Sequence, residues 1–244
     1  MRLRLLIQWL GILGCFSGCS TLNFADSGYY HSSLYDVKGN APASLALPAE
    51  NELTGIQDQA KADYHFTLAE TYSMQGKWAK AVENYKLTLI YDPKSHRSHF
   101  RLASEYVRGG LVNQAMEHCN QAIGLRDDYS EAHLLLASLQ SVMGFHKEAR
   151  KRYRALLEKD PNNHEAAILI GASYVDDGKL DKGIKYFETL AKTSKKSHVV
   201  WYYLGRTYLQ KDSKGNRANA ESAFRTAIRV QPDFVQPVIE LGNL

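Results

Sequence analysis

The chain has 244 residues, a formal net charge of +4 at neutral pH, 44% apolar residues and 11% aromatic residues. This length allows one or two compact domains, or one elongated array. Disordered chains are poorer in aromatic and apolar residues, so the composition favours a folded protein. Basic and acidic residues are interspersed, and the small net charge gives no indication of nucleic-acid binding.

Residues 1–18 are predicted to form a signal peptide. Arg2 and Arg4 introduce an apolar run from Leu3 to Leu13, which is shorter than the roughly 20 apolar residues that a membrane-spanning helix needs. Removing this segment deletes two arginines and no acidic residue, so the formal net charge falls from +4 to +2.

The sequence Phe16-Ser17-Gly18-Cys19 resembles the lipobox of bacterial lipoproteins, although leucine is commoner at the position of Phe16. This resemblance implies a lipoprotein signal peptide and acylation of Cys19, and Ser20 implies sorting to the outer membrane, facing the periplasm. Cys15 is a second candidate, but Cys19 leaves a longer apolar segment upstream and follows two small residues. An ordinary signal peptide or a simple membrane anchor is the alternative.

Residues 19–59 are predicted to be a lipidated N-terminus followed by a flexible tether. Ser, Gly, Asn, Ala and Pro dominate residues 20–57, and no helical apolar period is present. An alternative is that Tyr29, Tyr30 and Tyr35 dock on the folded part or on a partner. Cys119 is the one thiol expected to remain free, and we expect it to be a small buried hydrophobe.

A repeat begins near Ala62. Leucine or isoleucine recurs every 34 residues, at Leu68, Leu102, Leu136, Ile170 and Leu204, and a small residue follows each one. The fullest copy contains Trp201, Leu204, Gly205, Tyr208, Ala220, Phe224, Ala227 and Pro232. A 34-residue period with these residue types in this order resembles the tetratricopeptide repeat family, and the resemblance covers roughly residues 60–244.

The resemblance implies an all-α fold, a right-handed superhelical solenoid of antiparallel helix hairpins with about five repeats plus a terminal helix. The array is expected over residues 60–244, with repeats at about 62–95, 96–129, 130–163, 164–197 and 198–234, and the start of a sixth at 235–244. In the fifth copy three extra residues predict an exposed, mobile loop over Lys211–Arg217.

Glycine and proline are expected to mark the helix ends. The glycines that recur where each first helix should stop favour a left-handed cap, and they are Gly76, Gly110, Gly144 and Gly178. Asp92-Pro93 and Asp160-Pro161 should end second helices, because proline lacks the amide donor and clashes with the preceding turn.

The first helices of this family line a concave groove, which implies where a partner binds. An apolar stripe recurs there at 34-residue intervals: Phe66, Phe100, Leu134, Ile168 and Tyr202. Charged residues lie beside it: Glu70, Arg97, Arg101, Arg108, Glu131, Glu165 and Arg206. The hypothesis is a groove that accepts an apolar helix or an extended peptide, with its direction fixed by charge. The alternative is that the stripe packs between neighbouring first helices.

No catalytic residue, metal site or cofactor is predicted, and the chain is not expected to be an enzyme. His65, His99 and His133 recur at 34-residue intervals, but neighbouring helices pack about 8–10 Å apart, too far for a shared ion. They occupy a packing position of the repeat. Phosphate-loop and nucleophile-elbow motifs do not occur.

The sequence therefore predicts a membrane-anchored scaffold that binds other envelope proteins or peptides and assists assembly of a pilus, secretion, motility or murein complex. Lipobox, tether and repeats together resemble, in architecture, the pilotin lipoproteins of type IV pili. The alternative is a targeting arm of a longer enzyme, for example a glycosyltransferase, with its catalytic domain beyond residue 244. Nucleic acid and metal are not expected partners.

Overall fold

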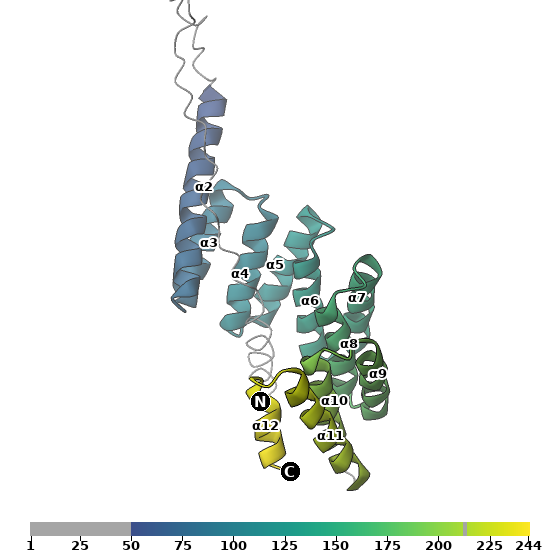
Figure 1. The fold of residues 1–244 in the computed structure, drawn as a ribbon. Coiled ribbons are helices and arrows are strands. Elements are labelled where there is room, and N and C mark those ends of the chain that lie inside the picture. The colour runs from purple at the N-terminus through teal and green to yellow at the C-terminus, as the bar shows by residue number, and fades with distance from the viewer. Residues whose placement is uncertain (1–49, 212–213) are drawn as a thin grey trace, which may run out of the picture. The chain divides into compact units, whose positions relative to one another are not determined.

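The computed structural model describes residues 50–211 and 214–244. The predicted signal peptide, Cys15, Cys19 and the tether tyrosines lie outside the described residues. The described part contains eleven α-helices and no strand (Figure 1). The chain divides into two compact units, residues 1–110 and residues 111–244. Among the helices of the described ranges, none combines the length and apolar character needed to cross a bilayer.

The first unit contains three helices, α2 (Glu50–Met74), α3 (Trp78–Tyr91) and α4 (His96–Arg108). α3 packs against both of its neighbours. Small residues bring these helices close together, because Ala69, Ala81 and Ala103 are fully buried beside Tyr85 and Leu102.

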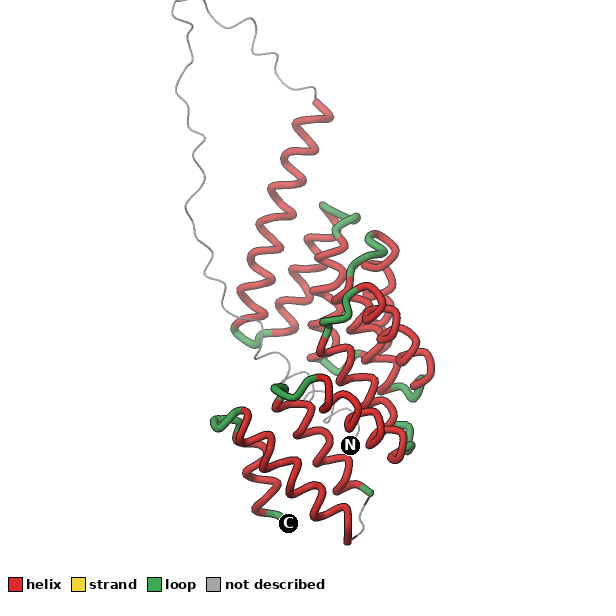
Figure 2. Tube along the Cα trace, turned by 45° about the vertical axis from the view of Figure 1, so that its right-hand side comes forward, coloured by secondary structure: helices red, strands yellow, loops and turns green. Residues whose placement is uncertain are grey.

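The second unit continues the alternation of first and second helices. Its elements are α5 (Val112–Leu125), α6 (Ser130–Val142), α7 (His146–Lys159), α8 (His164–Asp176), α9 (Leu180–Thr193), α10 (His198–Gln210), α11 (Lys214–Val230) and α12 (Val235–Gly242). Each helix packs against the next one along the chain, and α8 also contacts α6 and α10. Short loops join the consecutive helices from α5 to α10, and α11 to α12 (Figure 2).

The helix ends follow the expected backbone chemistry. The four capping glycines all have positive φ, between 71° and 88°. After Gly76, Gly144 and Gly178, the next amide donates to the carbonyl five residues earlier, at N···O distances of 2.8–2.9 Å. Asp92 and Asp160 are the C-caps of α3 and α7. The predicted glycine caps and proline stops are confirmed.

Two hairpin cores contain a glycine opposite an aromatic ring. In the α8–α9 hairpin a Cβ on Gly171 would lie 2.5 Å from Phe187, and in the α10–α11 hairpin a Cβ on Gly205 would lie 2.6 Å from Phe224. Both phenylalanines are fully buried. The rings therefore occupy the space that a side chain on either glycine would need.

The start of the array differs from the prediction. α2 begins at Glu50, so residues 50–59 are helical rather than part of the tether. From Thr54 to Lys61 almost every side chain is exposed, and Ala62 is the first buried residue after them. These turns lack an apolar period because no other described helix packs on them. Their Glu, Gln, Ala and Lys residues favour helix through intrinsic propensity.

The predicted loop in the fifth copy is also wrong in part. α11 begins at Lys214 and has 17 residues, whereas α3, α5, α7 and α9 each have 14. The three extra residues lengthen this second helix, which satisfies their backbone groups within the helix. Residues 212–213 lie outside the described residues.

Candidate peptide-binding faces

In the first unit, four of the predicted groove residues form one cluster between α2 and α4. The guanidinium of Arg97 lies 4.6 Å from the centre of the Phe66 ring, which is a cation–π distance. The Nε of Arg101 lies 3.0 Å from Oε1 of Glu70. Contacts across the helix pair therefore hold aromatic and charged groups together on one face.

Tyr85 of α3 contacts two members of this cluster, Glu70 and Phe66. Its hydroxyl donates to Oε1 of Glu70 at 2.6 Å, and its ring meets Phe66 edge-on at 5.7 Å between centroids. Burial, and then the hydrogen bond to Glu70, raise the pKa of Tyr85 well above its usual range. The Tyr85 phenol therefore stays protonated, and its hydrogen bond holds the Glu70 carboxylate in the position where it pairs with Arg101.

A second polar contact lies at the C-terminal ends of α2 and α4. Nη1 of Arg108 donates to the carbonyl and the hydroxyl of Ser73, at 3.2 and 2.9 Å, and lies 3.0 Å from Oε1 of Glu105. Ser73 also donates to Glu105 at 2.7 Å. Glu105 is 2% exposed, and its Oε2 accepts no hydrogen bond. Sequence analysis missed Glu105, although its i, i+3 spacing to Arg108 indicates an ion pair.

In the second unit, two members of the predicted stripe are buried. Ile168 and Tyr202 are each 5% exposed, and the ring of Tyr202 meets Phe224 at 6.0 Å and Phe234 at 5.3 Å between centroids. Leu134 is half-buried. Ile168 and Tyr202 therefore fill the space between helices, as the packing alternative expected, and offer little surface to a ligand.

Arg206 remains accessible in this unit. Its guanidinium lies 5.9 Å from the Tyr202 ring, and Nε lies 3.7 Å from Oε1 of Glu240 on α12. Its side chain is 41% exposed. A pocket of about 270 Å³ lies at the same end of the unit, lined by Leu209, Arg217, Glu240, Asn243 and Leu244.

The repeated histidines each have local partners. The ring of His65 stacks on Tyr91 at 5.9 Å, and its Nδ1 lies 3.2 Å from Oδ1 of Asn84. His99 is buried, which lowers its pKa. Nε2 of His133 lies 2.8 Å from the Asp127 carbonyl oxygen. Within residues 50–211 and 214–244, no three His, Cys, Asp or Glu side chains gather as potential metal ligands.

Comparison with known proteins finds repeat proteins made of helix hairpins, as in this chain. The tetratricopeptide repeat profile matches residues 106–173. RNA polymerase II-associated protein 3 from Homo sapiens is 32% identical over 132 residues, which is 54% of this chain and 20% of that protein. Tetratricopeptide repeat protein 21A from Homo sapiens is 28% identical over 153 residues, 61% of this chain and 11% of that protein. The chain thus spans a fifth or less of these relatives.

Solved structures resemble it over more of its length. A crystal structure of MamA has 21% identity and a TM-score of 0.57, covering 70% of this chain and 92% of that one. YrrB, a tetratricopeptide protein with an unusual peptide-binding site, has 20% identity and a TM-score of 0.55, covering 79% and 97%. MamA from Desulfovibrio magneticus RS-1 has 16% identity and a TM-score of 0.60, covering 71% and 97%.

The helices, caps and matches define a tandem helix-hairpin protein of the solenoid class, and the predicted fold class is confirmed. Residues 106–173 match the tetratricopeptide repeat, and the solved structures share the fold of the array.

Proposed function

We propose that this chain is a lipid-anchored scaffold that captures a partner protein or peptide and helps to assemble a cell-envelope complex. The observation that carries the binding role is the cluster of Phe66, Glu70, Arg97 and Arg101 on neighbouring first helices. The peptide-binding site named for YrrB, which shares the fold, supports the same use of the repeat. The anchor rests on the sequence ending at Cys19.

The first unit is the better candidate for partner contact. Arg97 is exposed, and the side chains of Arg101 and Arg108 are 43% and 54% exposed. Three guanidinium groups beside the half-buried rings of Phe66 and Phe100 suit a peptide that carries carboxylates next to an apolar side chain. In the second unit the accessible contacts are Leu134 and Arg206.

A photo-crosslinking amino acid in place of Arg97 tests the face directly. In cells of the native host, we expect a discrete adduct from position 97 and none from position 83, where Glu83 is also exposed but lies on the second helix α3. Adding Arg101→Gln should abolish the adduct while the far-ultraviolet circular dichroism stays unchanged. Equal adducts from both positions would rule out a specific face.

The anchor is tested separately by metabolic labelling with palmitate. Labelling should be lost in Cys19→Ala and retained in Cys15→Ala, and the labelled protein should fractionate with the outer membrane. An unlabelled parent protein would remove the lipid anchor and leave the binding face untouched. A parent protein that is labelled but forms no adduct would support the lipid anchor and exclude the binding face.

A further inference from the structure

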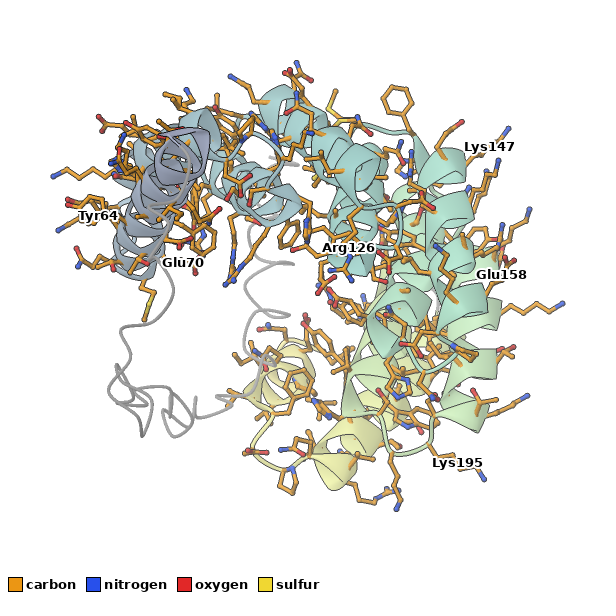
Figure 3. The ribbon with its side chains drawn as sticks, turned by 90° about the horizontal axis from the view of Figure 1, so that it is seen from above. Tyr64, Glu70, Arg126, Lys147, Glu158 and Lys195 are labelled. Atoms are coloured by element: carbon orange, nitrogen blue, oxygen red, sulfur yellow. The ribbon has the colours of Figure 1, made fainter. Side chains whose placement is uncertain are left out.

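Charge is segregated in the second unit. The second helices α7 and α9 together carry nine Lys and Arg against four Asp and Glu. The first helices α6, α8, α10 and α12 carry one arginine against four acidic residues. Lys147 and Glu158 of α7 and Lys195 after α9 point outward on the same side of this unit (Figure 3). The part of this unit's surface formed by α7 and α9 is therefore basic.

Four exposed lysines gather in the N-terminal halves of α7 and α9: Lys147, Lys151, Lys182 and Lys185. Among the residues that the structure describes, none of the four belongs to an ion pair. Two carboxylates lie among them. Glu148 is exposed, whereas Asp181 pairs with Lys211. Positive charge therefore remains in excess at this end, where the helix dipoles add to it.

A buried arginine fixes the two lysine-bearing helix starts relative to each other. Arg150 of α7 is 4% exposed and donates through Nη1 to the Ser173 carbonyl at 3.0 Å and through Nη2 to Asp177 at 2.8 Å. Asp177 also accepts from Lys179, the residue that precedes α9, at 2.6 Å. The lysines of both helices are therefore presented by one rigid support.

Two large apolar side chains are exposed at the same end. Met143 is 47% exposed and Phe145 is 51% exposed, and both lie in the turn that leads into α7, with Phe145 two residues before Lys147. The equivalent turn between α8 and α9 carries Asp177 and Lys179 instead. An apolar tip flanked by lysines is the combination that suits a bilayer interface, where rings enter the headgroup region and ammonium groups meet phosphates.

We propose that this tip, formed by Met143, Phe145, Lys147, Lys151, Lys182 and Lys185, docks on an anionic phospholipid surface. The tip holds a single aromatic ring, so it lacks the row of rings on which the bases of a single-stranded nucleic acid stack, and a membrane is the favoured occupant. The proposal does not depend on acylation of Cys19. Docking here would bring the α6–α7 and α8–α9 turns to the bilayer and leave the opposite ends of these helices away from it.

A fluorophore that responds to polarity tests insertion of the tip. The full chain carries Cys15→Ser and Cys19→Ser, and Cys119 is fully buried and stays unlabelled. The fluorophore is attached at Phe145→Cys or, as the matched control, at Leu125→Cys. Leu125 is 42% exposed, but it lies at the opposite helix end of the same unit. Vesicles contain phosphatidylcholine alone or with anionic phosphatidylglycerol.

We expect a blue shift only at position 145 and only with phosphatidylglycerol, and we expect high salt to remove it. Near an anionic surface each lysine contributes about a fivefold factor in binding, so Lys147→Glu with Lys182→Glu should weaken docking by more than about tenfold. Lys159→Glu with Lys192→Glu, the same charge change at the far ends of the same helices, should leave the shift nearly unchanged.

Three results would overturn the proposal. One is an equal shift at positions 145 and 125, which would report membrane association through another part of the chain. Another is an equal shift on phosphatidylcholine alone. The third is a shift that appears without vesicles and rises with protein concentration, since that would identify a second copy of the chain as the occupant of the tip.

Discussion

Gly171 and Phe187 are predicted to be a matched pair, so that Gly171→Ala destabilises the protein even though it replaces glycine within a helix. In an exposed helix this change stabilises by roughly 1 kcal/mol. Here the new Cβ would lie 2.5 Å from Cζ of Phe187, against a normal carbon–carbon contact of about 3.5–4.0 Å. The ring must therefore move by about 1 Å or the helices must separate.

Both movements cost free energy, because the ring is closely packed. Phe187 is fully buried and lies nearly parallel to the Tyr203 ring, 6.0 Å away between centroids, and the Tyr186 ring meets it edge-on at 6.2 Å. Overpacking of this kind costs about 1–3 kcal/mol. Because the overlap is about 1 Å and the ring is fully buried, we take the upper end of this range. Less about 1 kcal/mol of helix propensity and about 0.8 kcal/mol for one buried methyl group, the expected net loss in the free energy of unfolding is about 1 kcal/mol.

Urea denaturation, with hydrogen exchange of α8 and α9, measures this loss. Gly124→Ala is the control, because no atom lies within 4 Å of its added Cβ, and it should stabilise the protein slightly. In Phe187→Leu the ring is gone, so adding Gly171→Ala to that variant should cost less than it does in the parent. A Gly171→Ala protein as stable as the parent would refute the close-contact argument.

Three further results are expected. Arg150→Ala should lower the free energy of unfolding by about 2–4 kcal/mol, because it removes a charged donor from the carboxylate of Asp177 and the carbonyl of Ser173. Arg150→Lys should restore only part of the lost stability, and the urea midpoints of the two variants measure both effects. Burial raises the pKa of Cys119 to about 12, so its thiol should resist a chromogenic disulfide reagent at neutral pH until denaturant is added; rapid reaction in native buffer would contradict its burial. Burial and a hydrogen bond to Glu188 raise the pKa of Tyr208 to about 12, and burial also raises that of Tyr153. Unfolded tyrosine ionises near pH 10, so stability should hold below about pH 10 and fall as pH rises above it; the urea midpoint against pH, alongside tyrosinate absorbance, measures this.

The repeat itself was predictable because a few residue types have local backbone reasons for their positions. Gly144 and Gly178 need positive φ, and Pro93 and Pro161 directly follow the C-caps of α3 and α7. The glycines recur every 34 residues and the two prolines lie 68 residues apart, so both can be read without three-dimensional information.

The candidate site was less predictable, because a periodic stripe looks the same whether it is exposed or packed. Tyr202 is buried because Phe224 and Phe234, from two later parts of the chain, meet its ring. Arg97 and Arg101 are placed by partners about 30 residues upstream, Phe66 and Glu70. The first turns of α2 were not predicted to be helical, because they have no packing partner among the described helices and therefore carry no apolar pattern.

The length of α2 has a mechanical consequence. One uninterrupted helix runs from Glu50 to Met74, about 37 Å at 1.5 Å per residue. From Thr54 to Lys61 almost all of its side chains are exposed, and Ala62 is the first buried one after them, so about 12 Å of exposed helix precedes it. A pull or twist applied at residue 50 would reach the α2–α3 contact without an intervening loop to absorb it. A force applied to the chain upstream of residue 50 would therefore be transmitted through α2 to the first hairpin.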